Sequence, residues 1–500
     1  MRLIALAAAL FFCGAIALAA DWPPATDEPV VTEHQVTGRG HVLRYEALAG
    51  FLSVRDEFNK THGRVFYVFY RLISHDLRPI TFAWNGGPGS NASLLQLAAL
   101  GPFRVKDLNE YPSSPPPYQL TENESTWLDV TDLVFVDPVG TGYSYATKPE
   151  FDREFWSPKA DVASVTEFIR LFLAHYDYQR HAPIFLVGES YGTLRVAGVA
   201  GELTAKEFNV VGVVLISSVL GPERLGSESE HSDLTYINLL PSYTVAAFVH
   251  KKLPPDLAAD VNTAVEKSEQ WAIGQYSVAL LEGDRLPGSD RERIARDLSR
   301  FSGLPEQFIV QHNLRVGMEE FSSQLLEDSK QVVGHYDVRA TTAATSAGGE
   351  YNPTLDPSLN THGTGELIVP YLRDQLNIRT DAFYAGPFGG GWPPPPGPRG
   401  DWMSTRWDWS SAAAVDGDAA LARALRTNPR MQALIVSGTY DLSTPFFAAE
   451  YNVAHMNLDP QARARAQFVR YPAGHMVYLE SSTRNRLKND FMALMKQALQ

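Results

Sequence analysis

Cysteine is nearly absent from this 500-residue chain, because the only one is Cys13, close to the N-terminus. A secreted eukaryotic enzyme of this size would usually carry disulfides. If the N-terminal segment is removed, the mature chain has no thiol and no disulfide. The composition therefore favours a bacterial periplasmic or secreted protein.

A surplus of basic charge is also missing, since the formal net charge is −14. Nucleic-acid binding needs a basic footprint, so this class of protein is disfavoured. The 13 histidines include no H-E-x-x-H pair, and the chain has no cysteine cluster. No phosphate-binding loop or dinucleotide fingerprint is present. We therefore expect neither a metal nor a cofactor.

The chain has a single long apolar run, from Leu3 to Leu18, which follows Arg2. The run ends in small residues, Ala19 and Ala20, as a secretory signal peptide does before its cleavage site. An uncleaved membrane anchor is the alternative, but the run is short for a span. The pattern predicts a signal peptide over residues 1–20, cleaved near Ala19/Ala20, and no membrane attachment afterwards.

Short, almost uninterrupted apolar runs recur along the chain, and helical patterns separate several of them. Such runs are typical of parallel strands that are covered on both faces. The runs are 80–84, 132–136, 183–187, 210–216 and 431–436. Alternating strands and helices predict an α/β fold with right-handed crossovers.

The pattern changes after Pro222. Residues 223–380 are rich in helical patterns and lack strand-like apolar runs. We predict an α/β core in two parts, 21–222 and 381–500, interrupted by an inserted helical cap over 223–380.

One turn motif indicates the chemistry. Residues 188–192 match G-x-S-x-G, with an apolar strand before Ser190 and a helical pattern after it. This arrangement exposes a nucleophilic serine at the top of an α/β-hydrolase sheet. The fold class predicted is therefore an α/β-hydrolase with an inserted cap.

A serine hydroxyl needs a base, and in this fold the acid and the histidine follow the serine in the chain. Asp441 and His475 each follow a strand-like segment in this order. Singly, Asp441 could be a turn residue and His475 a solvated side chain. Together with the glycine-rich loop at 85–89, they indicate a Ser190–His475–Asp441 triad.

Five sequence blocks resemble the serine carboxypeptidase family (peptidase family S10). They are N-G-G-P-G at 85–89, D-P-V-G-T-G-Y-S at 137–144, G-E-S-Y-G at 188–192, G-T-Y-D at 438–441 and G-H-M at 474–476. The resemblance implies a carboxypeptidase that acts on peptides with a free C-terminus through an acyl-enzyme. It also implies an oxyanion hole formed by the N–H groups of Gly87 and Tyr191.

The resemblance further implies that Asn85 and Glu189 bind the C-terminal carboxylate of the substrate. Two carboxyl groups in contact cannot both stay ionised at low cost, so Glu189 would work protonated. We therefore expect carboxylate binding to weaken as the pH rises. The alternative for Glu189 is a structural carboxylate held by backbone amides.

The chain departs from the family at two positions. Well-known members have a second Glu before the Leu-Gly-Pro that follows this loop, where this chain has Ala99, and Ser90 replaces a frequent cysteine. An esterase or acyltransferase using the same triad is therefore an alternative function. A non-catalytic binding protein on a hydrolase scaffold is an alternative from a different class. The oligomeric state is not predicted.

Overall fold

The computed structural model describes residues 27–74, 77–106, 116–178, 182–220, 232–344, 356–359, 362–386, 407–410 and 414–500. The predicted signal peptide and Cys13 lie outside these ranges.

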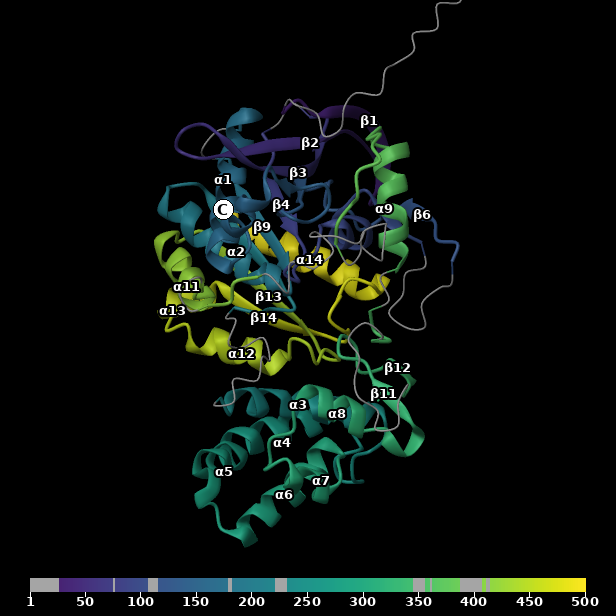
Figure 1. Cartoon of the computed structure of the whole chain (residues 1–500), viewed down its shortest axis with the longest axis vertical. Coiled ribbons are helices and arrows are strands. Elements are labelled where there is room, and N and C mark those ends of the chain that lie inside the picture. The colour runs from purple at the N-terminus through teal and green to yellow at the C-terminus, as the bar shows by residue number, and fades with distance from the viewer. Residues whose placement is uncertain are drawn as a thin grey trace, which may run out of the picture.

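A ten-stranded sheet forms the centre of the upper lobe in Figure 1. Its order is β1-β2-β3-β7-β4-β9-β10-β13-β14, with β8 paired to β3. The first three strands are antiparallel, and all pairs from β7 to β14 are parallel. The strands are β1 (Val30–Gly38), β2 (His41–Arg55), β3 (Thr61–Leu72), β4 (Ile80–Trp84), β7 (Asp132–Val136), β8 (Tyr145–Ala146), β9 (Ile184–Glu189), β10 (Val210–Ile216), β13 (Gln432–Gly438) and β14 (Ala466–Tyr471).

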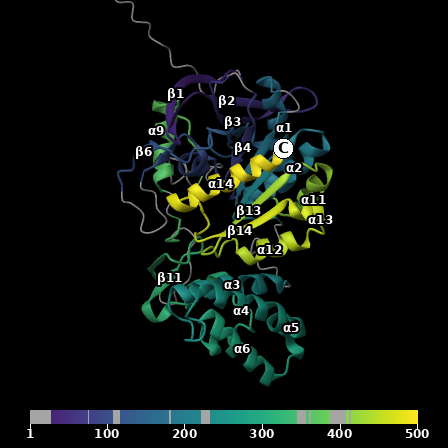
Figure 2. The same ribbon diagram turned by 180° about the vertical axis from the view of Figure 1, so that it is seen from behind.

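Helices cover both faces of this sheet, as the apolar strands require. One core cluster joins the sheet to α1 (Pro158–His175), α2 (Tyr191–Ala205), α11 (Gly417–Thr427), α12 (Phe446–His455) and α13 (Pro460–Ala464). The other joins it to η1 (Leu95–Leu100) and to α14 (Ser481–Ala498), which lies in front of the sheet in Figure 2. The predicted α/β-hydrolase fold is confirmed.

The inserted helices form a lower lobe (Figure 1), and its hydrophobic core also includes Leu442 and Phe446 from the α/β part. They are α3 (Leu234–Val249), α4 (Val261–Trp271), η4 (Ala272–Tyr276), α5 (Ser277–Glu282), η5 (Gly283–Arg285), α6 (Gly288–Ser302), α7 (Glu306–Gln311), α8 (Met318–Gln324) and η6 (Glu327–Ser329). A hairpin of β11 (Gln331–Val333) and β12 (Thr341–Ala343) follows them. Each of these strands has only three residues, which is too short for a strand to be predicted from an apolar run.

The last helix within the predicted cap range, α9 (His362–Asp374), lies with the core instead of the lower lobe. It contacts β5 (Phe103–Val105), which pairs with β6 (Leu120–Glu122). Elsewhere in the core, the short helix η2 (Pro149–Glu154) precedes α1. The buried side chains of α9 join the sheet cluster, and the hydroxyls of Tyr371 and Tyr70 lie 2.9 Å apart. The described residues therefore place the cap helices before residue 330.

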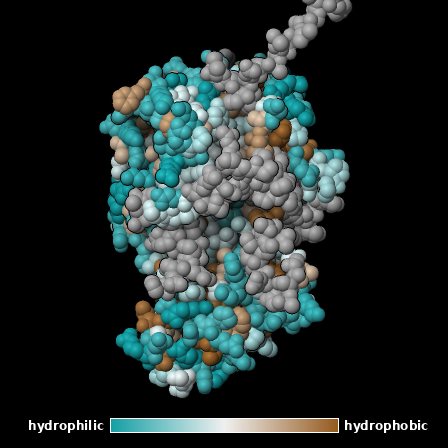
Figure 3. All heavy atoms as spheres, in the orientation of Figure 1, coloured by the Kyte–Doolittle hydropathy of each residue, from teal (hydrophilic) through white to brown (hydrophobic). Residues whose placement is uncertain are grey.

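The surface is mainly hydrophilic on both lobes in the view of Figure 3, with scattered hydrophobic side chains. The large hydrophobic side chains that are most exposed include Phe58 and Leu281. Among the described residues, no helix combines the length and the apolar character needed to cross a membrane.

Candidate active site

Ser190 occupies the sharp turn between β9 and α2. Its φ of 56° and ψ of −133° are unusual for a residue with a side chain. Its N–H donates to the carbonyl of Ile216 at the end of β10, over 2.9 Å. Strained backbone of this kind is characteristic of functional positions, and here it has the strand–turn–helix setting of a nucleophile elbow.

The glycine-rich loop after β4 lies directly against this turn. A Cβ added to Gly86 would come within 2.7 Å of the Tyr191 nitrogen and 2.9 Å of the Ser190 Cβ, so only glycine fits. Gly87 has a φ of 103°, which also favours glycine. Tyr191 begins α2, so its N–H has no partner within the helix. Two backbone segments that could stabilise an oxyanion thus meet beside Ser190.

His475 and Asp441 form a buried pair at the carboxyl ends of β14 and β13. The His475 Nδ1 lies 2.8 Å from the Asp441 Oδ2. Asp441 also accepts from the N–H of Thr444 at 3.0 Å and from its hydroxyl at 2.5 Å. The hydroxyl of Ser217, at the end of β10, donates to the His475 carbonyl at 2.5 Å. Neighbouring strands thus bring the ends of all three segments together.

The surroundings of His475 favour its protonated form. Burial lowers the pKa of His475, but the charge and hydrogen bond of Asp441 and the charge of Glu189 outweigh burial, so the pKa lies above its ordinary value. A charged acid beside the imidazole stabilises the imidazolium that forms when the histidine takes a proton. His475 is therefore suited to act as a general base, because Asp441 stabilises the charge that His475 gains with the proton.

Glu189, the residue before the candidate nucleophile, is buried among polar side chains that come from distant segments. Asn85 donates its amide to the Glu189 Oε2. The hydroxyl of Tyr478 lies 2.9 Å from both carboxylate oxygens. Burial raises the pKa of Glu189, although its hydrogen bonds and His475 act in the opposite direction. The structure thus places Asn85 and Glu189 together, as the sequence predicted, with a third group beside them.

A buried ion pair between Arg195 and Asp161 packs against the turn that carries Ser190. Arg195, on α2, pairs with Asp161, on α1, at 2.8 Å, and also donates to the Asn85 carbonyl at 2.9 Å. The Tyr191 hydroxyl donates to Asp161 at 3.0 Å. Both ends of the pair are therefore hydrogen-bonded, which such a buried pair requires. It links the glycine-rich loop, the helix after Ser190 and α1.

The segment between β11 and β12 joins the inserted region to the loops that carry Asp441 and His475. The carbonyl of His335 accepts from the N–H of Leu442 at 2.9 Å, and that of Tyr336 accepts from the N–H of His475 at 2.7 Å. The Tyr336 ring meets the His475 ring edge to face, with centroids 5.1 Å apart. This segment therefore helps to fix the imidazole.

Sequence reasoning missed five of these side chains: Thr444, Tyr478, Tyr336, and the paired Arg195 and Asp161. A hydroxyl three residues after Asp441 is a local turn signal that could have identified Thr444. The others reach the site from parts of the chain far from their partners, so no local pattern marks them. Among the described residues, no group of three or more His, Cys, Asp or Glu side chains could hold a metal.

Comparisons with known proteins identify a family for part of this chain. Residues 38–237 match the family described as serine carboxypeptidase. The matched residues include Ser190, Glu189 and the glycine-rich loop, whereas Asp441 and His475 lie beyond them.

Two curated relatives are pheromone-processing carboxypeptidases. That of Aspergillus niger is 32% identical over 196 residues, which is 39% of this chain and 29% of the relative. That of Podospora anserina is 24% identical over 326 residues, which is 62% of this chain and 45% of the relative. The chain thus spans less than half the length of these relatives.

The solved structure of Kex1(delta)p, a prohormone-processing carboxypeptidase from Saccharomyces cerevisiae, has a similar fold. The TM-score is 0.54 at 15% sequence identity, covering 90% of this chain and 91% of the other. This likeness shows that the two chains share an architecture.

Proposed function

We propose that this chain, of which residues 38–237 match the serine carboxypeptidase family, is a serine carboxypeptidase that releases C-terminal residues from peptides. The observation that carries this proposal is the buried carboxyl of Glu189 directly beside Ser190. A simple esterase has no need of a proton-bearing carboxyl at that position. An enzyme that must bind a free carboxylate does, since a protonated carboxyl can donate a hydrogen bond to it.

The triad would work as follows. The Ser190 hydroxyl attacks the scissile carbonyl while His475 takes its proton, and Asp441 holds the imidazole and stabilises its charge. The N–H groups of Gly87 and Tyr191 bind the oxyanion. His475 then gives the proton to the leaving amine, which departs as the C-terminal residue. Water, deprotonated by His475, hydrolyses the acyl-enzyme and the proton returns to Ser190.

Asn85 and Glu189 would bind the substrate's C-terminal carboxylate next to this centre. Asn85 is positioned for this role because its oxygen accepts from the N–H of Leu95 at 3.1 Å, while its amide contacts Glu189. The side chain is therefore held from both ends. Binding at a fixed distance from Ser190 would limit cleavage to the last peptide bond.

An esterase or acyltransferase is the second candidate function. The favouring observation is Ala99, which is fully buried in the hydrophobic cluster and supplies no carboxyl to the site. Parallel assays on a blocked dipeptide, its C-terminal amide and a p-nitrophenyl ester separate the two. A carboxypeptidase should cleave the blocked dipeptide far faster than the amide. Turnover of the ester alone would leave the esterase as the function.

The pH dependence provides a prediction about Glu189. Since its pKa is raised, Glu189 is neutral over a wider pH range than a free Glu, and it ionises as the pH rises through the raised value. The kcat/KM for peptides should then fall about tenfold per pH unit above that value. The kcat/KM of a neutral ester should not show this fall. The measurement is the ratio of the two profiles from pH 4 to 8.

The matched variant is Glu189→Gln, whose amide donates at every pH. Its ratio of peptide to ester kcat/KM should be independent of pH. A ratio that stays flat in the unmodified enzyme would contradict the protonated role of Glu189 and favour a structural carboxylate.

We further propose that the chain is exported, through removal of residues 1–20, to the periplasm or the medium. The sequence pattern of that segment supports this location. The N-terminal residue of the exported protein, expected near Asp21, tests it. The partner at the site would be a peptide with a free C-terminus.

A further inference from the structure

Tyr478 stands out as a buried hydroxyl in the carboxyl cluster that the motif pattern did not identify. Its side chain is fully buried, and Glu189 is 3% exposed. The two hydrogen bonds of 2.9 Å place the phenol oxygen evenly between the two carboxylate oxygens. A phenol in this position is neutral, and it can donate or accept a hydrogen bond.

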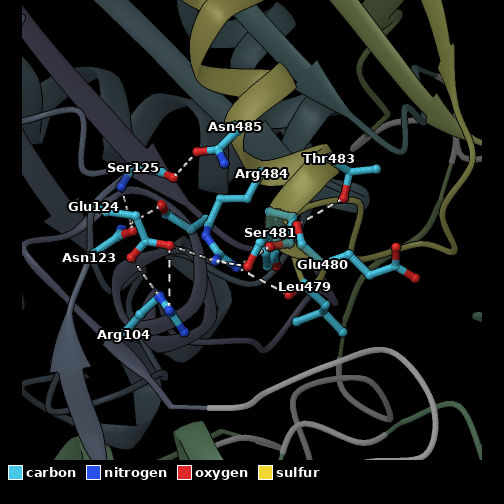
Figure 4. Close-up of polar contacts among 12 residues, drawn as sticks. Arg104, Asn123, Glu124, Ser125, Leu479, Glu480, Ser481, Thr483, Arg484 and Asn485 are labelled. Carbon is cyan, nitrogen blue, oxygen red and sulfur yellow. Dashed lines mark hydrogen bonds and ion pairs between the residues drawn. The ribbon is translucent and has the colours of Figure 1, made fainter. Parts of the chain in front are cut away.

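A buried guanidinium fixes the main chain that carries this phenol. The Nη1 of Arg484 donates to the carbonyls of Tyr478 and Leu479, each at 3.1 Å. Its Nη2 donates to Ser481 at 2.9 Å and pairs with Glu124 at 3.4 Å (Figure 4). The turn that begins at Tyr478 is thus anchored independently of the hydroxyl, so a phenylalanine at 478 should keep its place.

The charged and titratable groups that act on Glu189 come from several elements. His475 favours its ionised form, and Asp441 disfavours it. Tyr336, from the inserted region, also interacts electrostatically with it. Tyr478 differs from these because it contacts both oxygens and stays protonated, since burial and Glu189 hold the pKa of its phenol far above the ordinary value.

We propose that Tyr478 is a positioning residue that sets the pH at which the site stops binding a C-terminal carboxylate. This inference rests on the proposed role of Glu189. At low pH, the Glu189 carboxyl and the phenol together carry two hydrogens. They use one between themselves, which leaves one for the substrate carboxylate. When Glu189 loses its proton, the phenol hydrogen is held by the new anion, and none is left for the substrate.

Loss of the phenol hydroxyl should therefore raise the pH at which the site releases the substrate carboxylate. Tyr478 stabilises the ionised form of Glu189, and Tyr478→Phe removes this donor without adding charge. Hydrogen bonds to charged groups are strong enough that the midpoint of carboxylate binding should move up by about one to two pH units. Affinity at pH 4 should fall at most about tenfold, because a bond between neutral groups is weaker. A role in packing alone would not move the midpoint.

The experiment is calorimetric titration of the full-length protein from pH 4 to 8. The probes are N-acetyl-phenylalanine, N-acetyl-alanine and N-acetyl-lysine, each compared with its amide. Tyr471→Phe is the matched control, because Tyr471 is also buried and donates to Asp490 at 2.6 Å, outside the site. In Tyr471→Phe, the pH midpoint of carboxylate binding should equal that of the unmodified protein. In Glu189→Gln, carboxylate binding should show no pH midpoint.

Equal midpoints in Tyr478→Phe and the unmodified protein would overturn the proposal. The proposal would also be overturned if the unmodified protein bound none of the N-acetyl amino acids between pH 4 and 8. The result also separates this inference from the proposed function. A shifted midpoint in a protein that cleaves no blocked dipeptide would support the role of Tyr478 and reject the carboxypeptidase. Cleavage with an unshifted midpoint would do the reverse.

Discussion

Ser190→Ala should lower kcat on every substrate by about 10⁴- to 10⁶-fold, because no other group can form the acyl-enzyme. The remaining rate comes from the oxyanion donors and from binding. The backbone at this position has a φ of 56°, and alanine would adopt it at a cost similar to that of serine. Stability should therefore change little, and circular dichroism should report an intact fold.

Active-site labelling checks the same prediction. A fluorophosphonate should label the unmodified protein stoichiometrically and leave Ser190→Ala unlabelled. Ser322→Ala is the control, since this serine is buried in α8 of the inserted lobe. It should retain both labelling and activity. A protein that is not labelled at all would support the alternative of a non-catalytic binding protein.

Asp441→Asn should lower kcat by about 10⁴-fold while the site keeps its shape. An Asn amide can donate where the carboxylate only accepts, so the His475 Nδ1 would lose its acceptor and adopt the wrong tautomer. Thr444 would still contact the Asn oxygen through its N–H, which now donates to the Asp441 Oδ1 at 3.0 Å. The loss should therefore come from chemistry and not from disorder.

The pH profile distinguishes this effect from a general loss of activity. Because Asp441 raises the pKa of His475, its replacement should lower that pKa and shift the acid limb of the ester kcat/KM profile to lower pH. Asp260→Asn is the control, since Asp260 caps α4 in the inserted lobe and asparagine caps equally well. An Asp441→Asn enzyme with near-normal kcat would show that another residue supports His475.

The parts of the site that could be predicted from the sequence are those with local causes. The turn at Ser190 needs a strand, two glycines and a helix in immediate succession, and all are written in neighbouring residues. Tyr478 could not be predicted, because it is 289 residues from Glu189 and meets it only through the packing of the His475 loop. Ala99 indicated that one group is missing, but no local pattern indicated that Tyr478 contacts Glu189.

The fold shows the same division. Apolar runs predicted the parallel strands, because these strands are buried on both faces. The placement of α9 could not be predicted, because the same apolar helix face can pack on a sheet or on other helices. Its tyrosine, Tyr371, meets Tyr70 from β3, which is 301 residues away. Only the tertiary arrangement determines this contact.

The residues from β11 to β12 have a practical consequence for engineering. Besides the bonds to Leu442 and His475, the N–H of Val338 donates to the Tyr440 carbonyl at 2.9 Å. The lower lobe should thus be exchangeable as a module only over the helices from α3 to η6. A graft that also removes the hairpin would remove the hydrogen bonds that hold the loops of Asp441 and His475. Chimeras intended to change substrate preference should keep residues 331–344 with the recipient core.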